Sequence, residues 1–155
     1  MITKAKSIPD GVSAVMPMLV CRNVAAEIDF CKTTFDALEQ VRRNGPDGNV
    51  AHAALTINGA MLMIEGEWPT LSSRPPLADG SSPVIIYVYV ENVDRAIEKA
   101  VAAGAKILLP IKDQFWGDGT GRIIDPEGHV WTISSRIEET SSTEREERWS
   151  KVLNG

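Results

Sequence analysis

The sequence predicts an α+β protein built from two βαβββ modules that form a concave mixed sheet, with a short helix near the C-terminal end. Two observations predict this fold. The segments Leu19–Asp29 (LVCRNVAAEID) and Val88–Glu98 (VYVENVDRAIE) share one order, an apolar strand, an asparagine and an amphipathic helix, with the asparagines 69 positions apart, at 23 and 92. Three short strand-like segments then follow each helix.

Both expected helices begin after an asparagine suited to cap a helix, and both have one apolar face. In the first helix this face holds Val24, Ile28, Cys31 and Phe35, and in the second it holds Val93, Ala96, Ile97, Ala100 and Val101. Small-residue turns at 36–37 and 104–105 end the helices. The repeated order of whole elements indicates two related modules.

The remaining strands are expected at 38–43, 50–57 and 60–65 in the first module, and at 106–111, 121–124 and 129–134 in the second. Turns are expected at 46–48 (PDG), 58–59 (NG) and 125–128 (DPEG), and a flexible loop at 117–121 (GDGTG). The modules therefore span 14–66 and 83–136, joined by a Pro/Ser-rich linker at 67–82 and followed by a charged tail at 137–155. In the tail, Thr143 and Glu146 have capping-box spacing, which predicts a short helix carrying Trp149 and Val152.

The Asn58–Gly59 turn sets the register of a β-hairpin. A two-residue loop pairs Ile57 with Ala60, and it therefore places His52 directly opposite Glu65. Because side chains alternate along a strand, one face carries His52, Ala54, Thr56, Met61, Met63 and Glu65, and the other carries Ala51, Ala53, Leu55, Ile57, Ala60, Leu62 and Ile64. We expect the purely apolar face to lie under the helices and the mixed face to line the concave side.

The same alternation assigns side chains on the first strand of each module. Met16, Met18 and Val20, and likewise Ile85, Tyr87 and Tyr89, are expected on the concave side, whereas Val84, Ile86, Val88 and Val90 are expected to face the helices. All four internal methionines then share the concave side. Methionine is flexible and polarizable, so these residues predict either an adaptable ligand pocket or the filling of gaps in a closed core.

Several longer motifs resemble a known family. They are AAEIDFCKTTFDA (25–37), GPDGNVAHAAL (45–55), YVENVDRAIEKAVAAGA (89–105) and, the most specific, DQFWGDGTGRIIDPEGHVW (113–131). Over about residues 14–136 the chain resembles the vicinal oxygen chelate superfamily, with its glyoxalase, bleomycin-resistance and extradiol-dioxygenase members, and within it the PhnB-like glyoxalase-related branch. The resemblance implies paired βαβββ modules and a ligand cleft on the concave side of the sheet.

The resemblance also implies four positions at which metal-dependent members carry their ligands. They fall on Met16, Glu65, Ile85 and Thr132, and of these Glu65 alone has a side chain suited to a divalent ion. His52 adds a second donor, which is still fewer than the three or more that such sites use. We therefore expect no metal and no cofactor.

Two groups of residues are candidates for function. His52 and Glu65 form a dyad that could act as a general base, anchor a polar group of a ligand, or be an ordinary polar pair on a sheet. Phe115 and Trp116 are expected to form an aromatic wall at a pocket mouth, to pack against a second copy of the chain, or to anchor their loop. Trp68 in the linker is similarly placed. Arg122 is expected to pair with an anionic group of a ligand, with Asp113 or with Asp118.

The candidate ligand-binding residues share the concave side or the motif after it. They are Met16, Met18, Met61, Met63, Tyr87, Tyr89, Phe115, Trp116, Arg122 and Thr132.

Composition limits the partners. The formal net charge of −5 and the absence of a concentrated basic segment disfavour nucleic acid, and no apolar run approaches the length of roughly 20 residues that a membrane helix needs. Cys21 and Cys31 lack CxxC spacing, so two reduced core thiols and a cytoplasmic location are expected. Because open sheet edges need covering, we expect a homodimer.

These observations support three hypotheses. The first is a metal-independent protein of the glyoxalase/bleomycin-resistance type that binds a planar or amphipathic small molecule in a cleft lined by Met, Tyr and Trp. The alternative is a glyoxalase-like enzyme, a lyase, isomerase or dioxygenase, that uses His52 and Glu65 with or without a divalent metal. A third is an interaction module whose cavity has collapsed.

Overall fold

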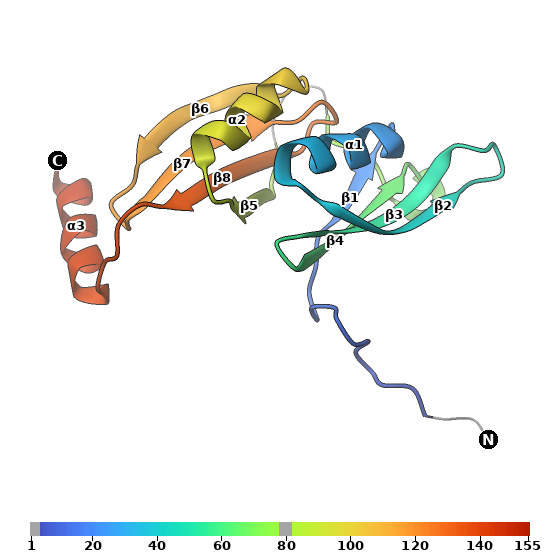
Figure 1. Cartoon of the computed structure of the whole chain (residues 1–155), viewed down its shortest axis with the longest axis horizontal. Coiled ribbons are helices and arrows are strands. Elements are labelled where there is room, and N and C mark those ends of the chain that lie inside the picture. Colours follow the sequence, from blue (N-terminus) through green and yellow to red (C-terminus); the bar gives the residue numbers. More distant parts are fainter. Residues whose placement is uncertain (1–3, 78–81) are drawn as a thin grey trace. The chain divides into compact units, whose positions relative to one another are not determined.

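A computed structural model of the chain describes residues 4–77 and 82–155. The chain divides into unit 1 (Met1–Lys32 and Asp36–Pro75) and unit 2 (Thr33–Phe35 and Pro76–Gly155). Each unit contains one four-stranded mixed sheet and shows the expected order of a strand, a helix and three further strands (Figure 1). The α+β fold of two βαβββ modules with a C-terminal helix is thus confirmed.

Unit 1 contains most of one helix and a sheet in the order β1-β4-β3-β2. Asn23 caps the helix as predicted, because its side chain accepts a hydrogen bond of 3.0 Å from the amide of Ala26. The helix ends at Asp36, which takes a left-handed conformation with φ of 53°. The elements are β1 (Met18–Cys21), α1 (Val24–Phe35), β2 (Leu38–Asn44), β3 (Val50–Ile57) and β4 (Ala60–Gly66), followed by a 3-10 turn at Pro69–Leu71.

Unit 2 repeats this plan with the order β5-β8-β7-β6. Asn92 caps α2 by accepting a hydrogen bond of 2.9 Å from the amide of Arg95, and α2 packs against β6, β7 and β8. The elements are β5 (Ile85–Tyr89), α2 (Val93–Ala102), β6 (Lys106–Asp113), β7 (Asp118–Ile124), β8 (Val130–Arg136) and α3 (Ser142–Asn154). The DPEG turn is also as expected, since Asp125 accepts hydrogen bonds of 2.9 Å from the amides of both Glu127 and His129.

The hairpin register is confirmed in full. Asn58 and Gly59 both have positive φ, 48° and 82°, as a type I′ turn requires, and His52 pairs with Glu65. The apolar face is the core of unit 1, since Ala53, Leu55 and Ile64 are fully buried. The mixed face lies on the side away from α1, and most of its side chains are half-buried.

The glycine-rich segment 117–121 was expected to be a loop, and this prediction is wrong. The turn is shorter, ending at Gly117 with φ of 96°, and β7 begins at Asp118. Gly121 lies inside this strand. The position requires glycine because a Cβ atom there would collide with Cδ1 of Ile97 on α2. The glycine therefore allows close packing of helix on sheet, which a local sequence pattern does not distinguish from flexibility.

The C-terminal helix forms as predicted, but its cap differs. Ser141, not Thr143, is the N-cap residue: it accepts a hydrogen bond of 3.1 Å from the amide of Glu144, whose carboxylate accepts one of 2.7 Å from the amide of Ser141. Both pairs have the same spacing, so the sequence alone allowed either. Arg148 ties this helix to the segment that precedes it, because its guanidinium contacts both carboxylate oxygens of Glu138, at 2.6 and 2.8 Å.

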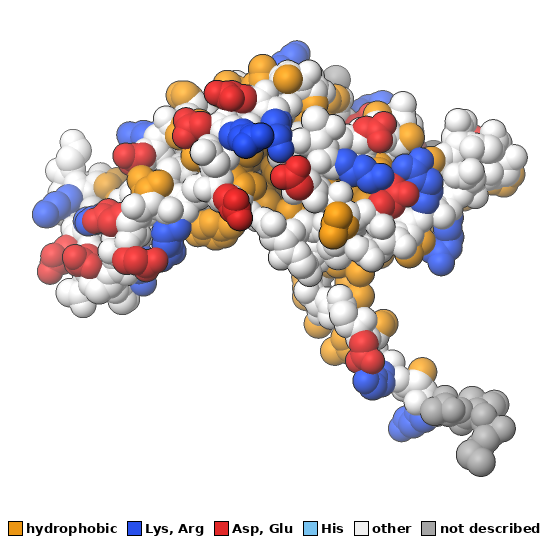
Figure 2. All heavy atoms as spheres, viewed as in Figure 1, with side chains coloured by type: hydrophobic (Ala, Val, Ile, Leu, Met, Phe, Trp, Pro, Cys, Tyr) orange, Lys and Arg blue, Asp and Glu red, His pale blue; other side chains and the backbone are white. Residues whose placement is uncertain are grey.

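The surface is mixed in charge. Figure 2 shows acidic and basic side chains interspersed over the face of each unit that it displays, without a broad basic patch. Within the described part of the chain, no helix is long and apolar enough to cross a membrane. Cys21 and Cys31 are buried and form no disulfide.

Candidate functional site

The carboxylate of Asp118, at the start of β7, joins several side chains of unit 2. Its side chain is fully buried. Its Oδ2 accepts hydrogen bonds from the hydroxyl of Tyr89 at 2.6 Å, the indole N–H of Trp116 at 2.9 Å and the hydroxyl of Tyr87 at 3.2 Å. Three aromatic side chains, two from β5 and one from the turn before β7, are thus tied to one carboxylate.

Electrostatics keep Asp118 ionised. Burial alone raises the pKa of a carboxyl group, but the hydrogen bonds from Tyr89, Trp116 and Tyr87 outweigh it and hold the pKa of Asp118 below its usual range. Arg136 adds an ion pair, with Nε 3.4 Å from Oδ1. In return, donation to Asp118 raises the pKa of Tyr89 to about 12.

The strand register defines the surface around this carboxylate. Gly119 and Gly121 point toward α2, so Asp118, Thr120 and Arg122 point to the opposite side of the sheet. We call that side the tyrosine face; its residues are Ile85, Tyr87, Tyr89, Lys106, Leu109, Lys112, Asp118, Thr120, Arg122, Ile124, Val130, Thr132, Ser134 and Arg136.

The sequence placed Tyr87, Tyr89, Arg122 and Thr132 together, and they do share this face. Tyr87 pairs with Thr132, which pairs in turn with Arg122. Nε of Arg122 donates a hydrogen bond of 3.1 Å to the hydroxyl of Thr132. Of the three partners considered for Arg122, the structure pairs it with neither Asp113 nor Asp118.

Phe115 and Trp116 lie in the turn between β6 and β7. Their rings meet edge to face with centroids 4.9 Å apart, and Phe115 also contacts Trp149 of α3 at 5.2 Å. Phe115 therefore packs within unit 2 and helps to hold α3. Trp116 is half-buried, and its indole N–H reaches the buried carboxylate of Asp118.

The mixed face of unit 1 gathers the other predicted residues. Met18 pairs with Met63 across β1 and β4, and Met61 pairs with Thr56 across the hairpin. We call this the methionine face; Met16 is half-buried just before β1. His52 and Glu65 lie opposite each other here, yet no hydrogen bond joins their side chains among the contacts of the described residues.

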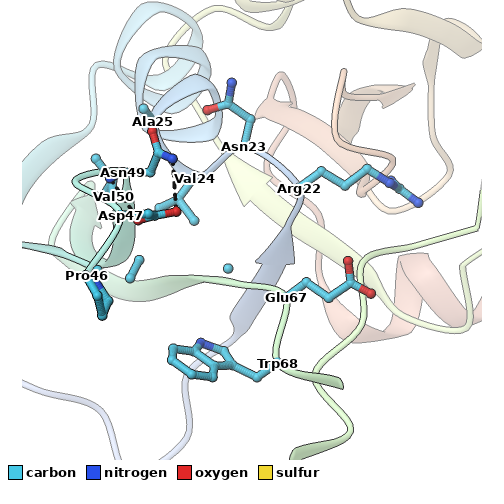
Figure 3. A pocket seen from close by; sticks show the side chains of 13 residues that line it. Arg22, Asn23, Val24, Ala25, Pro46, Asp47, Asn49, Val50, Glu67 and Trp68 are labelled. Carbon is cyan, nitrogen blue, oxygen red and sulfur yellow. Dashed lines mark hydrogen bonds between the residues drawn. The ribbon is translucent and has the colours of Figure 1, made fainter. Parts of the chain in front are cut away.

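Unit 1 also contains a pocket of about 680 Å³ at the N-terminal end of α1. In Figure 3 the indole of Trp68 lies along one side of it, the charged ends of Arg22 and Glu67 lie on another, and Asp47 and Asn49 are joined by hydrogen bonds of 3.0 Å. Trp68 was expected at a pocket mouth and does line this pocket, whereas Asp47 was expected to be a turn residue and Asn49 had no expected role.

Comparison with known proteins identifies the family. The model of the glyoxalase/bleomycin resistance protein/dioxygenase superfamily matches residues 13–133. The chain belongs to this superfamily. An uncharacterized protein of Mycobacterium bovis is 39% identical over 134 residues, covering 84% of this chain and 88% of the relative. An uncharacterized protein of Mycobacterium tuberculosis matches equally well, with 79% of its length covered.

Several solved structures share the fold of this chain. TioX from Micromonospora is 25% identical with a TM-score of 0.62, covering 81% of this chain and 99% of TioX. A PhnB protein from Bacillus cereus has 21% identity and a TM-score of 0.61, with 79% and 99% covered. The fosfomycin resistance protein FosX from Listeria monocytogenes, solved with Mn(II) and sulfate, has 16% identity and a TM-score of 0.63, with 92% and 99% covered.

The residues present do not fit the divalent metal that some members of the glyoxalase superfamily carry. Glu65 is flanked on its sheet by Val20 on one side and His52 on the other, and Arg43 follows His52. A guanidinium at that position repels a cation. Among the described residues, no three His, Cys, Asp or Glu side chains lie close enough to hold a metal ion.

Sequence reasoning missed the central role of Asp118 and Arg136 in this superfamily member. Asp118 lies in GDGTG, which was read as a loop, and its tyrosine partners lie 29 and 31 residues earlier in the chain. One signal was present in the sequence, since Asp118 is an acidic residue in a glycine-rich segment, two positions after Trp116. Once the order of the strands is known, Asp118 lies on the same face as the tyrosines.

Proposed function

We propose that this chain is a metal-independent small-molecule binding protein of the glyoxalase/bleomycin-resistance type, and that it takes a planar or amphipathic ligand on the tyrosine face. One observation carries the proposal. A tyrosine usually buries its ring and leaves its hydroxyl near water. In this protein the hydroxyls of Tyr87 and Tyr89 bond to a buried carboxylate, while the side chains remain 45% and 48% exposed.

This arrangement suits recognition of a flat apolar group. The two rings lie 5.4 Å apart and are tilted by 53°, and each is fixed at its hydroxyl end by Asp118. A surface held in place before binding loses little conformational entropy when a ligand covers it. Aromatic ligands gain both area burial and ring contacts on such a surface.

The absence of a suitable donor set supports the metal-independent part of the proposal. Glu65 and His52 together supply two donors, and a site for a divalent ion takes three or more. Binding through the tyrosine face uses neither residue. Addition of a divalent ion is therefore expected to change neither ligand affinity nor the thermal midpoint of unfolding.

The test is a fluorescence titration with the uncharged planar dye N-phenylnaphthylamine in the presence of EDTA. We expect saturable binding at one site. The double variant Tyr87→Ala/Tyr89→Ala should weaken it by about tenfold or more, because two aromatic contacts are lost. Trp68→Ala, which removes an exposed aromatic side chain from the pocket of unit 1, is the matched control and should leave affinity unchanged.

Three results would refute the proposal: no saturable binding, binding that requires added metal, or wild-type affinity in the double variant. Circular dichroism of each variant separates loss of the site from loss of the fold. Weaker dye binding by Trp68→Ala, with wild-type affinity in the double variant, would place the binding site in unit 1.

A second candidate function is enzymatic and rests on the register of the hairpin. His52 and Glu65 are directly opposed, so a carboxylate is available to orient the imidazole during proton abstraction from an α-oxo substrate. This candidate predicts turnover that His52→Ala abolishes without a change in the thermal midpoint. An absence of turnover over a panel of α-oxo compounds, with and without metal, argues against it.

We also propose a homodimer. The strands β1, β2, β5 and β6 are edges of their sheets, and Ile107, Leu108, Leu109 and Ile111 leave apolar side chains exposed on β6. An uncovered apolar edge favours association with another chain. Sedimentation equilibrium measures this directly, and a monomer at all accessible concentrations would contradict it.

A further inference from the structure

We infer that the ligand of the tyrosine face is a planar organic anion, and that Arg122 holds its carboxylate or sulfonate group. This inference rests on the proposed function and adds the chemical class of the ligand. Three features of the described residues carry it: the charge of the face, the bonding of Arg122 and the state of Asp118.

The tyrosine face is positive in a protein that is negative as a whole. The chain has 21 acidic and 16 basic residues. On this face the strands β5 to β8 place four basic side chains and a single acidic one; they are Lys106, Lys112, Arg122 and Arg136, against Asp118. A local excess of one sign raises the concentration of ligands of the opposite sign near the surface.

Arg122 is the member of this set with capacity for a ligand. It is half-buried at the middle of β7, and its Nε donates to Thr132. No carboxylate among the described residues forms an ion pair with it. Guanidinium has five N–H donors, so its terminal nitrogens retain the paired geometry that binds a carboxylate or sulfonate through two hydrogen bonds.

Asp118 does not oppose an anion on this face. Its carboxylate is fully buried beneath the tyrosines, and its charge is met by three hydrogen-bond donors and by Arg136. A ligand above the rings therefore meets tyrosine and arginine, while the negative charge is shielded from it.

The spacing sets the length of the ligand. Arg122 lies two strands away from Tyr87, with Thr132 between them. Neighbouring strands are about 4.8 Å apart, so the two backbones are separated by about 10 Å. A body of two or three rings with an anionic group at one end spans that distance.

A matched pair of dyes isolates the charge. The first is anilinonaphthalene sulfonate, and the second is its uncharged parent, N-phenylnaphthylamine. We expect the wild type to bind the sulfonate about tenfold more tightly, because a charge-assisted pair at a half-buried site contributes on this scale. Arg122→Gln should remove that preference and leave the affinity for the uncharged dye unchanged.

Arg95→Gln is the control, because it removes the same charge from an exposed position on α2. It should change neither affinity. A second measurement uses the wild type alone: added salt should weaken binding of the sulfonate and not of the parent dye, since salt screens a charge interaction.

The outcomes separate the two proposals. Equal affinity for the dyes in the wild type, or sulfonate binding that survives Arg122→Gln, overturns the inference about the anion while the proposed function stands. Binding of neither dye overturns both. Loss of the uncharged dye in the arginine variant, with an unchanged fold, would show that Arg122 shapes the face instead of reading charge.

Discussion

Replacement of Asp118 by Asn should destabilise unit 2 while changing its volume little. The carboxylate is fully buried and accepts hydrogen bonds from Tyr87, Tyr89 and Trp116 on a single oxygen. Asparagine keeps one oxygen that can accept them, but it lacks the charge. Its amide group must then take the place of Oδ1, which faces the guanidinium of Arg136 at 3.4 Å.

The magnitude follows from the number of bonds. A hydrogen bond to a charged group contributes about 1.5–3 kcal/mol, and one between neutral groups about 0.5–1.5 kcal/mol, so each bond loses roughly 1 kcal/mol. Three bonds give about 3 kcal/mol. For a chain of 155 residues, this lowers the thermal midpoint by roughly 6–12 °C.

The assay is thermal and urea unfolding followed by circular dichroism, with Asp113→Asn as the matched control. Asp113 is exposed at the end of β6, so the same chemical change there should leave the midpoint within about 1 °C. Equal midpoints for Asp118→Asn and the wild type would refute the view that this carboxylate organises the three aromatic side chains.

The difference in the free energy of unfolding between the wild type and Asp118→Asn should also depend on pH. The pKa of Asp118 is lowered on folding, so its stabilisation is present above the unfolded value of about 4 and is lost as pH falls through the folded value. The wild type and Asp118→Asn should therefore converge in stability at acidic pH. A gap that does not narrow as pH falls below about 4 would contradict the assigned direction.

Further predictions concern titration, packing and capping. The pKa of about 12 for Tyr89 predicts that folding stability falls as pH rises from about 10 to 12, and Asp118→Asn should move the near-ultraviolet absorbance change of this tyrosine toward pH of about 10. Gly121→Ala should cost about 1–3 kcal/mol, read from urea unfolding, because the added methyl group overpacks the contact with α2. Ser141→Ala should speed amide hydrogen exchange in the first turn of α3, whereas Thr143→Ala should not; the reverse result would reassign the cap.

The elements that the sequence predicted well depend on local patterns. The hairpin of β3 and β4 follows from one turn and an alternation of period two, so its register and both its faces could be derived before the structure. The helix starts at Asn23 and Asn92 follow from capping chemistry in the same way. These patterns operate within a few residues and leave a direct trace in the sequence.

What the sequence did not predict depends on contacts between distant segments. Asp118 on β7 can reach the tyrosines of β5 because both strands lie beside β8 in the sheet. Nothing near position 118 encodes that strand order. Gly121 has a tertiary cause as well, since α2 packs closely over the strand at that position. The same composition, read locally, indicates a loop. The pairing of His52 with Glu65 was predictable, whereas the aromatic side chains held by Asp118 were not.

The buried charge of Asp118 also bears on the proposed function. Burying a carboxylate costs several kcal/mol, and apolar residues of similar size often stabilise a protein equally well. Asp118 in exchange fixes the orientation of three aromatic side chains, two of which leave their rings half-exposed. An apolar residue at this position would retain the sheet but release the tyrosine hydroxyls. The buried charge therefore fixes the geometry of an exposed aromatic surface, as the proposed binding of a flat ligand requires.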